Sequence, residues 1–221
     1  MILKYGTFFL DDQKVNSPDE ISLDSSANCC RIEMPCSIEN EIKMQENRYI
    51  LADRTLKVSV NLSKLDNFLL KQVRLPVVKS SDFNKDIEEI AFDSFKSDRR
   101  FHFLPRCNQD IAKLVIKDWV DSLDSSFVCS FKDQIVGFLN LKNTSEKEAE
   151  IYLAAVKEKY RLAGSALALY TTALFYAKDN GMNIVTGRIS TANLPVLNLY
   201  SSFGAKFSEA HDIFLKELSW I

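Results

Sequence analysis

The chain has 221 residues, of which 46% are hydrophobic and 26% are charged, and its formal net charge is −2. That length can bury a sizeable core, either as one domain with an appendage or as two small domains. The near balance of charge gives no reason to expect nucleic acid or an anionic membrane as a partner. No apolar run approaches the roughly 20 residues that span a bilayer, and no basic-then-apolar signal opens the chain. We therefore expect a soluble cytoplasmic protein.

The five cysteines form an odd, unevenly spaced set. Cys29, Cys30 and Cys36 have no matching partners at a zinc-binding spacing, and the only histidines are His102 and His211. Reduced, buried thiols are therefore expected rather than a disulfide framework or a metal site.

Residues 1–68 are predicted to form a small partial α/β subdomain. Its expected elements are strand-like pieces within 1–10 and 21–35, a brief helix over 37–45, and two strands over 49–52 and 55–62. Helix, strand, turn and strand follow one another in the same order at the end of the chain. The pattern indicates that this region is a degenerate partial copy of the C-terminal part.

Residues 69–221 follow the order of a mixed α/β domain. The predicted strands are 72–78 (interrupted at Pro76), 126–131, 135–141, 149–156, 183–190, and one or two strands over 206–218 with a break near His211. The predicted helices are 82–95, 108–123, 163–180 and one that begins at Asn193. A short connection at 132–134 predicts a hairpin between the second and third of these strands.

The most informative segment joins the strand at 149–156 to the helix that follows it. That strand is apolar and partly β-branched, and the helix pattern ends at Gly181, a natural residue for a helix C-terminus. Between them lies a short basic turn with a glycine. Free backbone N–H groups and the positive end of a helix dipole converge at such a junction. The arrangement predicts an anion site for a ligand that carries a pyrophosphate.

Two linked motifs resemble the GNAT acetyltransferase superfamily. Arg161-x-x-Gly164-x-Ala166 resembles its coenzyme A signature, Gln/Arg-x-x-Gly-x-Gly/Ala, at the expected place between a central strand and the main helix. Downstream, Asn193, a helix with Tyr200, and the turn at Gly204 resemble a second feature of the family. The resemblance implies an α/β (α+β) GNAT fold, in which helices flank a mixed central sheet, preceded by a truncated GNAT-like N-terminal half-domain. Simpler readings remain open: close helix packing at Gly164, an N-cap at Asn193 and a core position for Tyr200.

The resemblance also implies roles for individual residues, with acetyl-CoA as the donor and no metal. Backbone N–H groups of Leu162, Ala163, Gly164, Ser165 and Ala166 would cradle the pyrophosphate, with Arg161 beside them. Leu162 departs from the glycine that many relatives have there. Ala154, Ala155 and Val156 would pair with the pantetheine like an extra strand, and Asn193 would contact the same arm. Tyr200 would protonate the departing thiolate. No spacing selects the base among Glu89, Asp93, Asp98, His102 or a water chain.

A narrower resemblance points to an acceptor. Arg99-Arg-Phe-His-Phe-x3-Cys107, the helix that ends near Trp119, and the opening Tyr5-Gly-Thr-Phe-Phe9 resemble dTDP-fucosamine acetyltransferases. This implies direct acetylation of a nucleotide-linked amino sugar of the dTDP-4-amino-4,6-dideoxyhexose type, for polysaccharide biosynthesis. The N-terminal region would then wall the acceptor site or support packing. The alternatives are a free amino sugar, another small amine, a peptide N-terminus, or an acyl-CoA-binding module without turnover. The open sheet edges are compatible with a homodimer.

Overall fold

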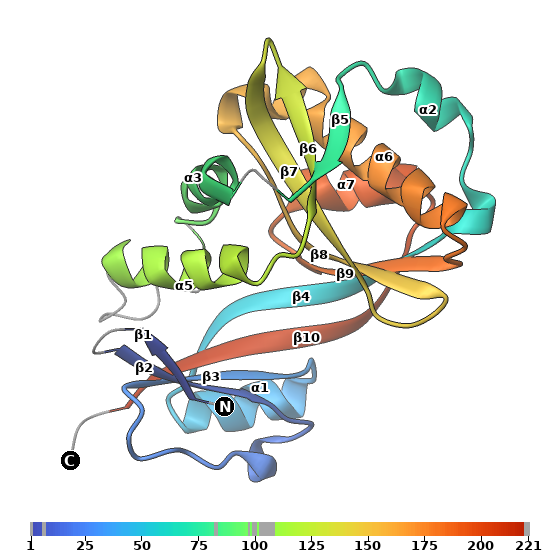
Figure 1. The fold of residues 1–221 in the computed structure, drawn as a ribbon. Coiled ribbons are helices and arrows are strands. Elements are labelled where there is room, and N and C mark those ends of the chain that lie inside the picture. The colour runs from blue at the N-terminus through green and yellow to red at the C-terminus, as the bar shows by residue number, and fades with distance from the viewer. Residues whose placement is uncertain are drawn as a thin grey trace.

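A computed structural model describes residues 2–5, 8–81, 84–96, 98, 101 and 109–218. Within these residues, ten strands form one mixed sheet in the order β1-β2-β3-β10-β4-β9-β8-β7-β6-β5 (Figure 1). The strands are β1 (Ile2–Tyr5), β2 (Phe8–Lys14), β3 (Cys29–Pro35), β4 (Ile50–Asn61), β5 (Val77–Ser80), β6 (Ser126–Phe131), β7 (Gln134–Asn143), β8 (Glu148–Val156), β9 (Ile184–Ser190) and β10 (Lys206–Glu217). The β2–β3 and β8–β9 pairs are parallel, and the remaining pairs are antiparallel.

Helices cover both faces of the sheet (Figure 1). They are α1 (Ile38–Glu46), α2 (Phe68–Gln72), α3 (Asn84–Phe95), α5 (Gln109–Asp121), α6 (Ser165–Asp179) and α7 (Leu194–Ser202). The main core lies between α6, α7 and the strands β4, β8 and β9. Helices α3 and α5 pack on β6, β7 and the end of β8, whereas α1 packs on β3 and β10. Mixed α/β architecture with helices on a large sheet confirms the predicted fold class.

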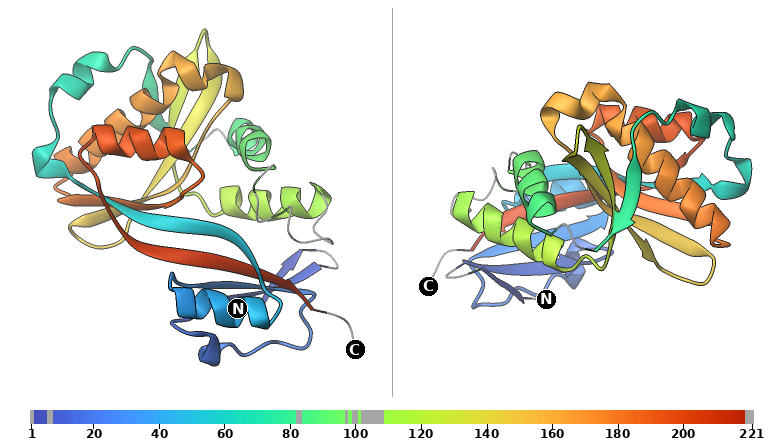
Figure 2. Two further views of the ribbon diagram at one scale, coloured as in Figure 1. Left: turned by 180° about the vertical axis from the view of Figure 1, so that it is seen from behind. Right: turned by 45° about the horizontal axis from the view of Figure 1, so that its top comes forward.

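Strands β4 and β10 join the two ends of the molecule. Each has 12 residues, and they run side by side from the N-terminal strands to the rest of the sheet (Figure 2). Val58 and Val60 of β4 are fully buried in the main core with Leu169 of α6. Strands from residues 1–68 and from residues 69–221 therefore belong to one continuous sheet. The division of the chain into two domains at residues 68 and 69 stays a prediction.

Most predicted elements are confirmed, and the hairpin between β6 and β7 turns at Lys132 and Asp133, which both have positive φ. Two expectations are wrong. One strand, β4, replaces the two strands at 49–52 and 55–62, because pairing with Asp212 and Ile213 of β10 holds the chain extended through Asp53 and Arg54. The first strand of the second region begins at Val77, after α2 has ended. The closing segment, expected as one or two strands with a break near His211, is the single strand β10 with an irregularity between Ser208 and His211.

The cysteine prediction agrees with the structure where it can be compared. Cys29, Cys30 and Cys129 are buried free thiols, Cys36 is half-buried, and Cys107 lies outside the described residues. Burial raises the pKa of Cys30 to about 12. Among the described residues, no group of three or more His, Cys, Asp or Glu side chains could hold a metal ion. In the same part of the chain, no helix is long and apolar enough to cross a membrane.

Candidate active site

A β-bulge in β8 reshapes the sheet ahead of the signature loop. The pairing of β8 with β7 shifts between Ile151 and Leu153, so Tyr152 is the extra residue. Before the bulge, Ile151 packs in the core beneath α6. After it, Leu153 packs with α3 and α5, although alternation alone would place both side chains on one face. The bulge therefore reverses which side chains of β8 face each layer.

Strands β8 and β9 separate beyond the bulge. Their parallel pairing ends at Ile151 and Gly187, yet β8 continues to Val156 and β9 continues to Ser190. On its other side, β8 stays paired with β7 as far as Val156. We call the gap between 152–156 of β8 and 188–190 of β9 the wedge. It leaves one edge of the last residues of β8 without a neighbouring strand.

A cavity of about 560 Å³ passes this wedge. Side chains of α6 and α7 and their connections line one part of it, namely Tyr170, Asn193, Val196 and Tyr200. Side chains from β1, β2, β3 and α5, on the other side of the sheet, line a second part, including Tyr5, Asp12, Arg31, Glu33, Val115 and Trp119. The wedge itself contributes Tyr152–Ala154 and Arg188–Ser190. The cavity thus connects the two faces of the sheet at the wedge.

The signature loop has the predicted strand–turn–helix form. A 3-10 turn (Glu158–Ala163) follows β8, and Gly164 then adopts a left-handed φ of 82° directly before α6. Leu162 is fully exposed. The Arg161 Nε donates to the carbonyl oxygen of Val156 at 3.2 Å. Of the predicted cofactor residues, Ala154 and Asn193 line the cavity, and the loop itself lies at the N-terminus of α6 outside the lining.

Tyr200 lies in the cavity wall on α7. The helix begins at Asn193, whose side-chain oxygen accepts from the backbone N–H of Val196 at 3.4 Å, so the N-cap reading is correct. Tyr200 is only 1% exposed, and its ring meets the edge of the Tyr170 ring at 5.3 Å. Burial, with the neighbouring Tyr170, raises the pKa of Tyr200 well above its ordinary value. The phenol therefore keeps its proton at neutral pH.

Gly187 makes room for that phenol. A Cβ atom at position 187 would lie 2.9 Å from the Tyr200 hydroxyl oxygen, which is closer than real Cβ contacts allow. The hydroxyl therefore lies directly over the backbone of β9, where the β8–β9 pairing ends. The position of the Tyr200 hydroxyl depends on the missing side chain at residue 187.

The part of the cavity lined by the N-terminal strands combines charged and aromatic groups. Arg31 contacts Asp12 at 2.6 Å and Glu33 at 3.2 Å, and Arg188 lies 3.8 Å from Glu33. The rings of Phe101 and Trp119, which also line the cavity, stack with centroids 6.0 Å apart. Burial, with Asp118 as the second cause, raises the pKa of the nearby Tyr5 to about 12.

Asp53 is a further cavity carboxylate, and it is not among the site residues that the sequence predicts. It is 9% exposed and accepts from Ser190 Oγ at 2.7 Å and from the Arg54 backbone N–H at 2.9 Å. Its signal in the sequence is a carboxylate between two apolar runs, a pattern that predicts a turn.

The candidate bases named from sequence are separated by the fold. Asp98 lines the cavity. Glu89 and Asp93 are exposed on α3 outside the lining, and Asp93 pairs with Lys96 at 2.8 Å. His102 lies outside the described residues, as do Arg99, Arg100 and most of the segment up to Cys107.

Comparisons with known proteins agree with this geometry. The family model described as the Acetyltransferase (GNAT) family matches residues 85–205, just over half of the chain. No curated protein matches the chain.

Among solved structures, similarity extends over most of the chain at low identity. A conserved protein of unknown function from Staphylococcus epidermidis has a TM-score of 0.63 at 14% identity over 88% of this chain and 74% of its own. A GCN5-related N-acetyltransferase from Sphaerobacter thermophilus gives 0.60 at 15% over 86% and 59%. A tandem GNAT protein from the clavulanic acid biosynthesis pathway gives 0.57 at 12% over 87% and 65%. At such identities these structures show a shared fold. With the family match, they place this chain in the GNAT acetyltransferase family.

Proposed function

We propose that this enzyme transfers the acetyl group of acetyl-CoA to the amino group of an amino sugar. The observation that carries the proposal is the cavity that passes the wedge, because donor and acceptor must meet for direct transfer. The donor enters from the side of α6 and α7. The acceptor occupies the part lined by the N-terminal strands and α5.

The donor binds along the wedge and the start of α6. The edge of Ala154, Ala155 and Val156 that faces the wedge can pair with the pantetheine amides as a strand would. The pyrophosphate lies at the N-terminus of α6, against the backbone N–H groups of 162–166 and the Arg161 side chain. Asn193 contacts the pantetheine arm beside Tyr200.

The chemistry needs a proton donor near the sulfur. The amine attacks the thioester carbonyl, and the tetrahedral intermediate expels the thiolate of coenzyme A. The Tyr200 phenol protonates that thiolate, for which its place beside the wedge is suitable. A backbone N–H of the free β8 edge can polarise the thioester carbonyl.

The acceptor part of the cavity favours a compact polar molecule that also has an apolar face. The stacked Phe101 and Trp119 offer a flat surface for the C–H face of a sugar ring, and a volume of about 560 Å³ holds such a ligand beside the pantetheine arm. Arg31 and Arg188 are both close to Glu33, so free guanidinium charge is limited here. A free amino sugar therefore matches the charges better than a diphosphate.

A nucleotide-linked 4-amino sugar is the second candidate. The sequence resemblance to dTDP-fucosamine acetyltransferases supports it, although most of 99–107 lies outside the described residues. Two arginines in the lining could meet phosphate groups if their carboxylate partners moved aside. Assembly into a homodimer through the edges β1 or β5 stays a prediction.

The test is thiol release from acetyl-CoA with a panel of acceptors: glucosamine, a 4-amino sugar linked to dTDP, one linked to UDP, a polyamine and a short peptide. Selective turnover of glucosamine supports the proposal, and selective turnover of a nucleotide-linked sugar supports the second candidate. Turnover of only the polyamine or the peptide would overturn the amino-sugar assignment. Acetyl-CoA binding without turnover of any amine would overturn the proposed function itself.

A further inference from the structure

Asp53 occupies a special place in the sheet. It lies on β4, a strand from the N-terminal region that runs between β9 and β10. The β4–β9 ladder ends at Thr55 and Ser190, so Asp53 lies two residues beyond the last pair, where β9 gives way to the turn before α7. Its side chain lines the cavity together with Ser190, Asn193 and Tyr200. The N-terminal region thus places a carboxylate at the wedge.

Hydrogen bonds fix the Asp53 carboxylate against that turn. Ser190 Oγ donates to Asp53 Oδ1 at 2.7 Å and accepts from the backbone N–H of Ala192 at 3.2 Å. One residue earlier, the Thr191 N–H donates to the Arg54 carbonyl at 2.8 Å. The carboxylate is therefore held in one orientation relative to the start of α7, the helix that carries Tyr200.

No ion pair to Asp53 is formed by the described residues. Its hydrogen-bond donors, Ser190 and the Arg54 backbone, are neutral, and both bonds end on Oδ1. The guanidinium of Arg54 is engaged elsewhere, with Asp212 at 2.5 Å and Glu41 at 3.1 Å. Other cavity carboxylates, such as Glu33, have arginine partners. A buried carboxylate without a cation is costly, so this position is suited to a positively charged ligand.

We propose that Asp53 is a catalytic residue that binds the acceptor ammonium through Oδ2 and takes its first proton. This inference rests on the proposed amine acetylation. The ammonium R–NH₃⁺ gives one proton to the carboxylate and becomes R–NH₂, whose lone pair forms the bond to the acetyl carbon. As the carbon–sulfur bond breaks, the thiolate gains a proton from Tyr200, and the second proton of the nitrogen restores the Tyr200 phenol. The Asp53 proton then leaves to solvent, so that one proton is released for each amide formed.

Several other groups share the cavity and could affect its pH dependence. The acids are Asp12 of β2, Glu33 of β3 and Asp98 beyond α3. The bases are Arg31 of β3 and Arg188 of β9. The phenols are Tyr5 of β1, Tyr152 of β8, Tyr170 of α6 and Tyr200 of α7. From β10, His211 contacts Glu33 at 3.0 Å. The test must therefore separate Asp53 from these groups by a substitution at position 53 alone.

The chain offers a matched control. Asp53 is the fourth residue of β4, and Glu209 is the fourth residue of β10, the strand paired with it. Glu209 is about half exposed, pairs with Lys57 at 2.8 Å and lies 3.8 Å from Arg188, and it does not itself line the cavity. Glu209→Gln therefore removes a carboxylate from the equivalent strand position outside the cavity lining.

The experiment compares Asp53→Asn, Asp53→Glu and Glu209→Gln with the wild type, using whichever amine of the panel is acetylated. At pH 7 we expect Asp53→Asn to lower kcat/KM by about 10²-fold or more and to raise the acceptor KM, while the acetyl-CoA Kd stays within about twofold. The loss should shrink as pH rises above the pKa of the free acceptor, because a neutral amine needs no base. Asp53→Glu should recover part of the activity, and Glu209→Gln should retain all of it.

Two results would overturn the assignment. One is an Asp53→Asn enzyme with near wild-type kcat/KM. The other is a loss of the same size at every pH, which a merely positional role would give. These failures are distinct from failure of the proposed function, because a peptide or polyamine acceptor would still report on Asp53. A wild type that acetylates no amine would overturn both.

Discussion

Two strand–helix–strand units of this molecule have the same dimensions but different content. The first is β3-α1-β4 and the second is β9-α7-β10, and in both the elements have 7, 9 and 12 residues. The strands of each unit pair with strands of the other. The first residue of β3 pairs with the last of β10, as the first residue of β9 pairs with the last of β4. The arrangement agrees with the partial copy that the order of elements in the sequence indicates.

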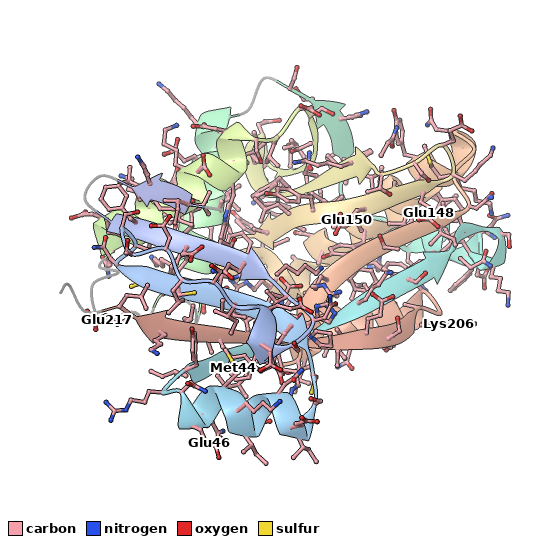
Figure 3. All side chains as sticks on the ribbon, turned by 90° about the horizontal axis from the view of Figure 1, so that it is seen from below. Met44, Glu46, Glu148, Glu150, Lys206 and Glu217 are labelled. Carbon is pink, nitrogen blue, oxygen red and sulfur yellow. The ribbon has the colours of Figure 1, made fainter. Side chains whose placement is uncertain are left out.

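Two pairs of equivalent positions distinguish core from site in these units. The seventh residue of α1 is Met44 and that of α7 is Tyr200, and each is 1% exposed (Figure 3 shows Met44 on the side of α1 towards the strands and Glu46 on the other). The fourth residue of β3 is Ile32 and that of β9 is Gly187. Ile32 and Met44 pack as core, whereas Gly187 leaves space for a phenol hydroxyl. The comparison teaches that the same strand–helix–strand arrangement can form packed core or part of a site. The sizes of the two side chains that face each other, one on the strand and one on the helix, distinguish the two cases.

The largest effect should come from breaking the ion pair that joins the units. Asp212 of β10 is fully buried and receives two bonds from the guanidinium of Arg54 on β4, at 2.5 and 2.9 Å. Arg54→Met would leave that carboxylate unpaired, so we expect the free energy of unfolding to fall by about 3 kcal/mol in urea denaturation. Lys57→Met, which removes only an exposed pair with Glu209, should cost less than about 1 kcal/mol. Equal losses would show that burial of Asp212 is not what matters.

The next largest effect should come from removal of the Tyr200 hydroxyl, in the second unit. Tyr200→Phe should lower kcat by roughly 10²-fold, about 2.7 kcal/mol, with the acetyl-CoA Kd nearly unchanged. Because burial raises the Tyr200 pKa, the proton donor is present below that pKa and is lost only as pH rises through it. In steady-state assays, wild-type kcat should therefore show no decline due to Tyr200 between about pH 7 and 10. Full activity of the Phe enzyme would exclude the phenol from the mechanism.

A smaller effect is expected from a methyl group added at Gly187, the strand position equivalent to Ile32. Gly187→Ala would push the Tyr200 hydroxyl from its place and should lower kcat about 10-fold, near 1.4 kcal/mol. The effect should largely vanish when the same substitution is made in Tyr200→Phe, since phenylalanine lacks the displaced oxygen. A double-mutant cycle on kcat measures this coupling. Additive losses would mean that Gly187 acts through another contact.

The smallest effect belongs to the first unit. Met44→Leu conserves most of the volume in a cluster with Ile32 and Phe214, so thermal or urea unfolding should show a loss below about 1.5 kcal/mol. Acetyl transfer should be unchanged. A marked loss of kcat in this variant would contradict the division of roles between Met44 and Tyr200.

Local patterns allowed much of the fold to be predicted. The apolar spacing of the helices, the hairpin at Lys132 and Asp133, and the glycine-containing turn before α6 depend on residues close in sequence. By contrast, Asp53 and Arg54 resemble a turn when seen alone, which predicts two strands in place of β4. Pairing with Asp212 and Ile213 of β10, far along the chain, keeps that segment extended. The charge of Arg54 within the strand is stabilised by the same distant residue, Asp212.

The sequence by itself determined the family, the signature loop before α6 and the helix that carries Tyr200. Each of these depends on motifs within short, continuous segments. Only the tertiary structure decided that β4 crosses into the centre of the sheet and carries Asp53 to the wedge. It also decided that Gly187 lies against the Tyr200 hydroxyl, whereas Ile32 packs in a core cluster with Met44. These outcomes depend on which strands become neighbours. That choice follows from burial summed over the whole sheet, and no local pattern encodes it.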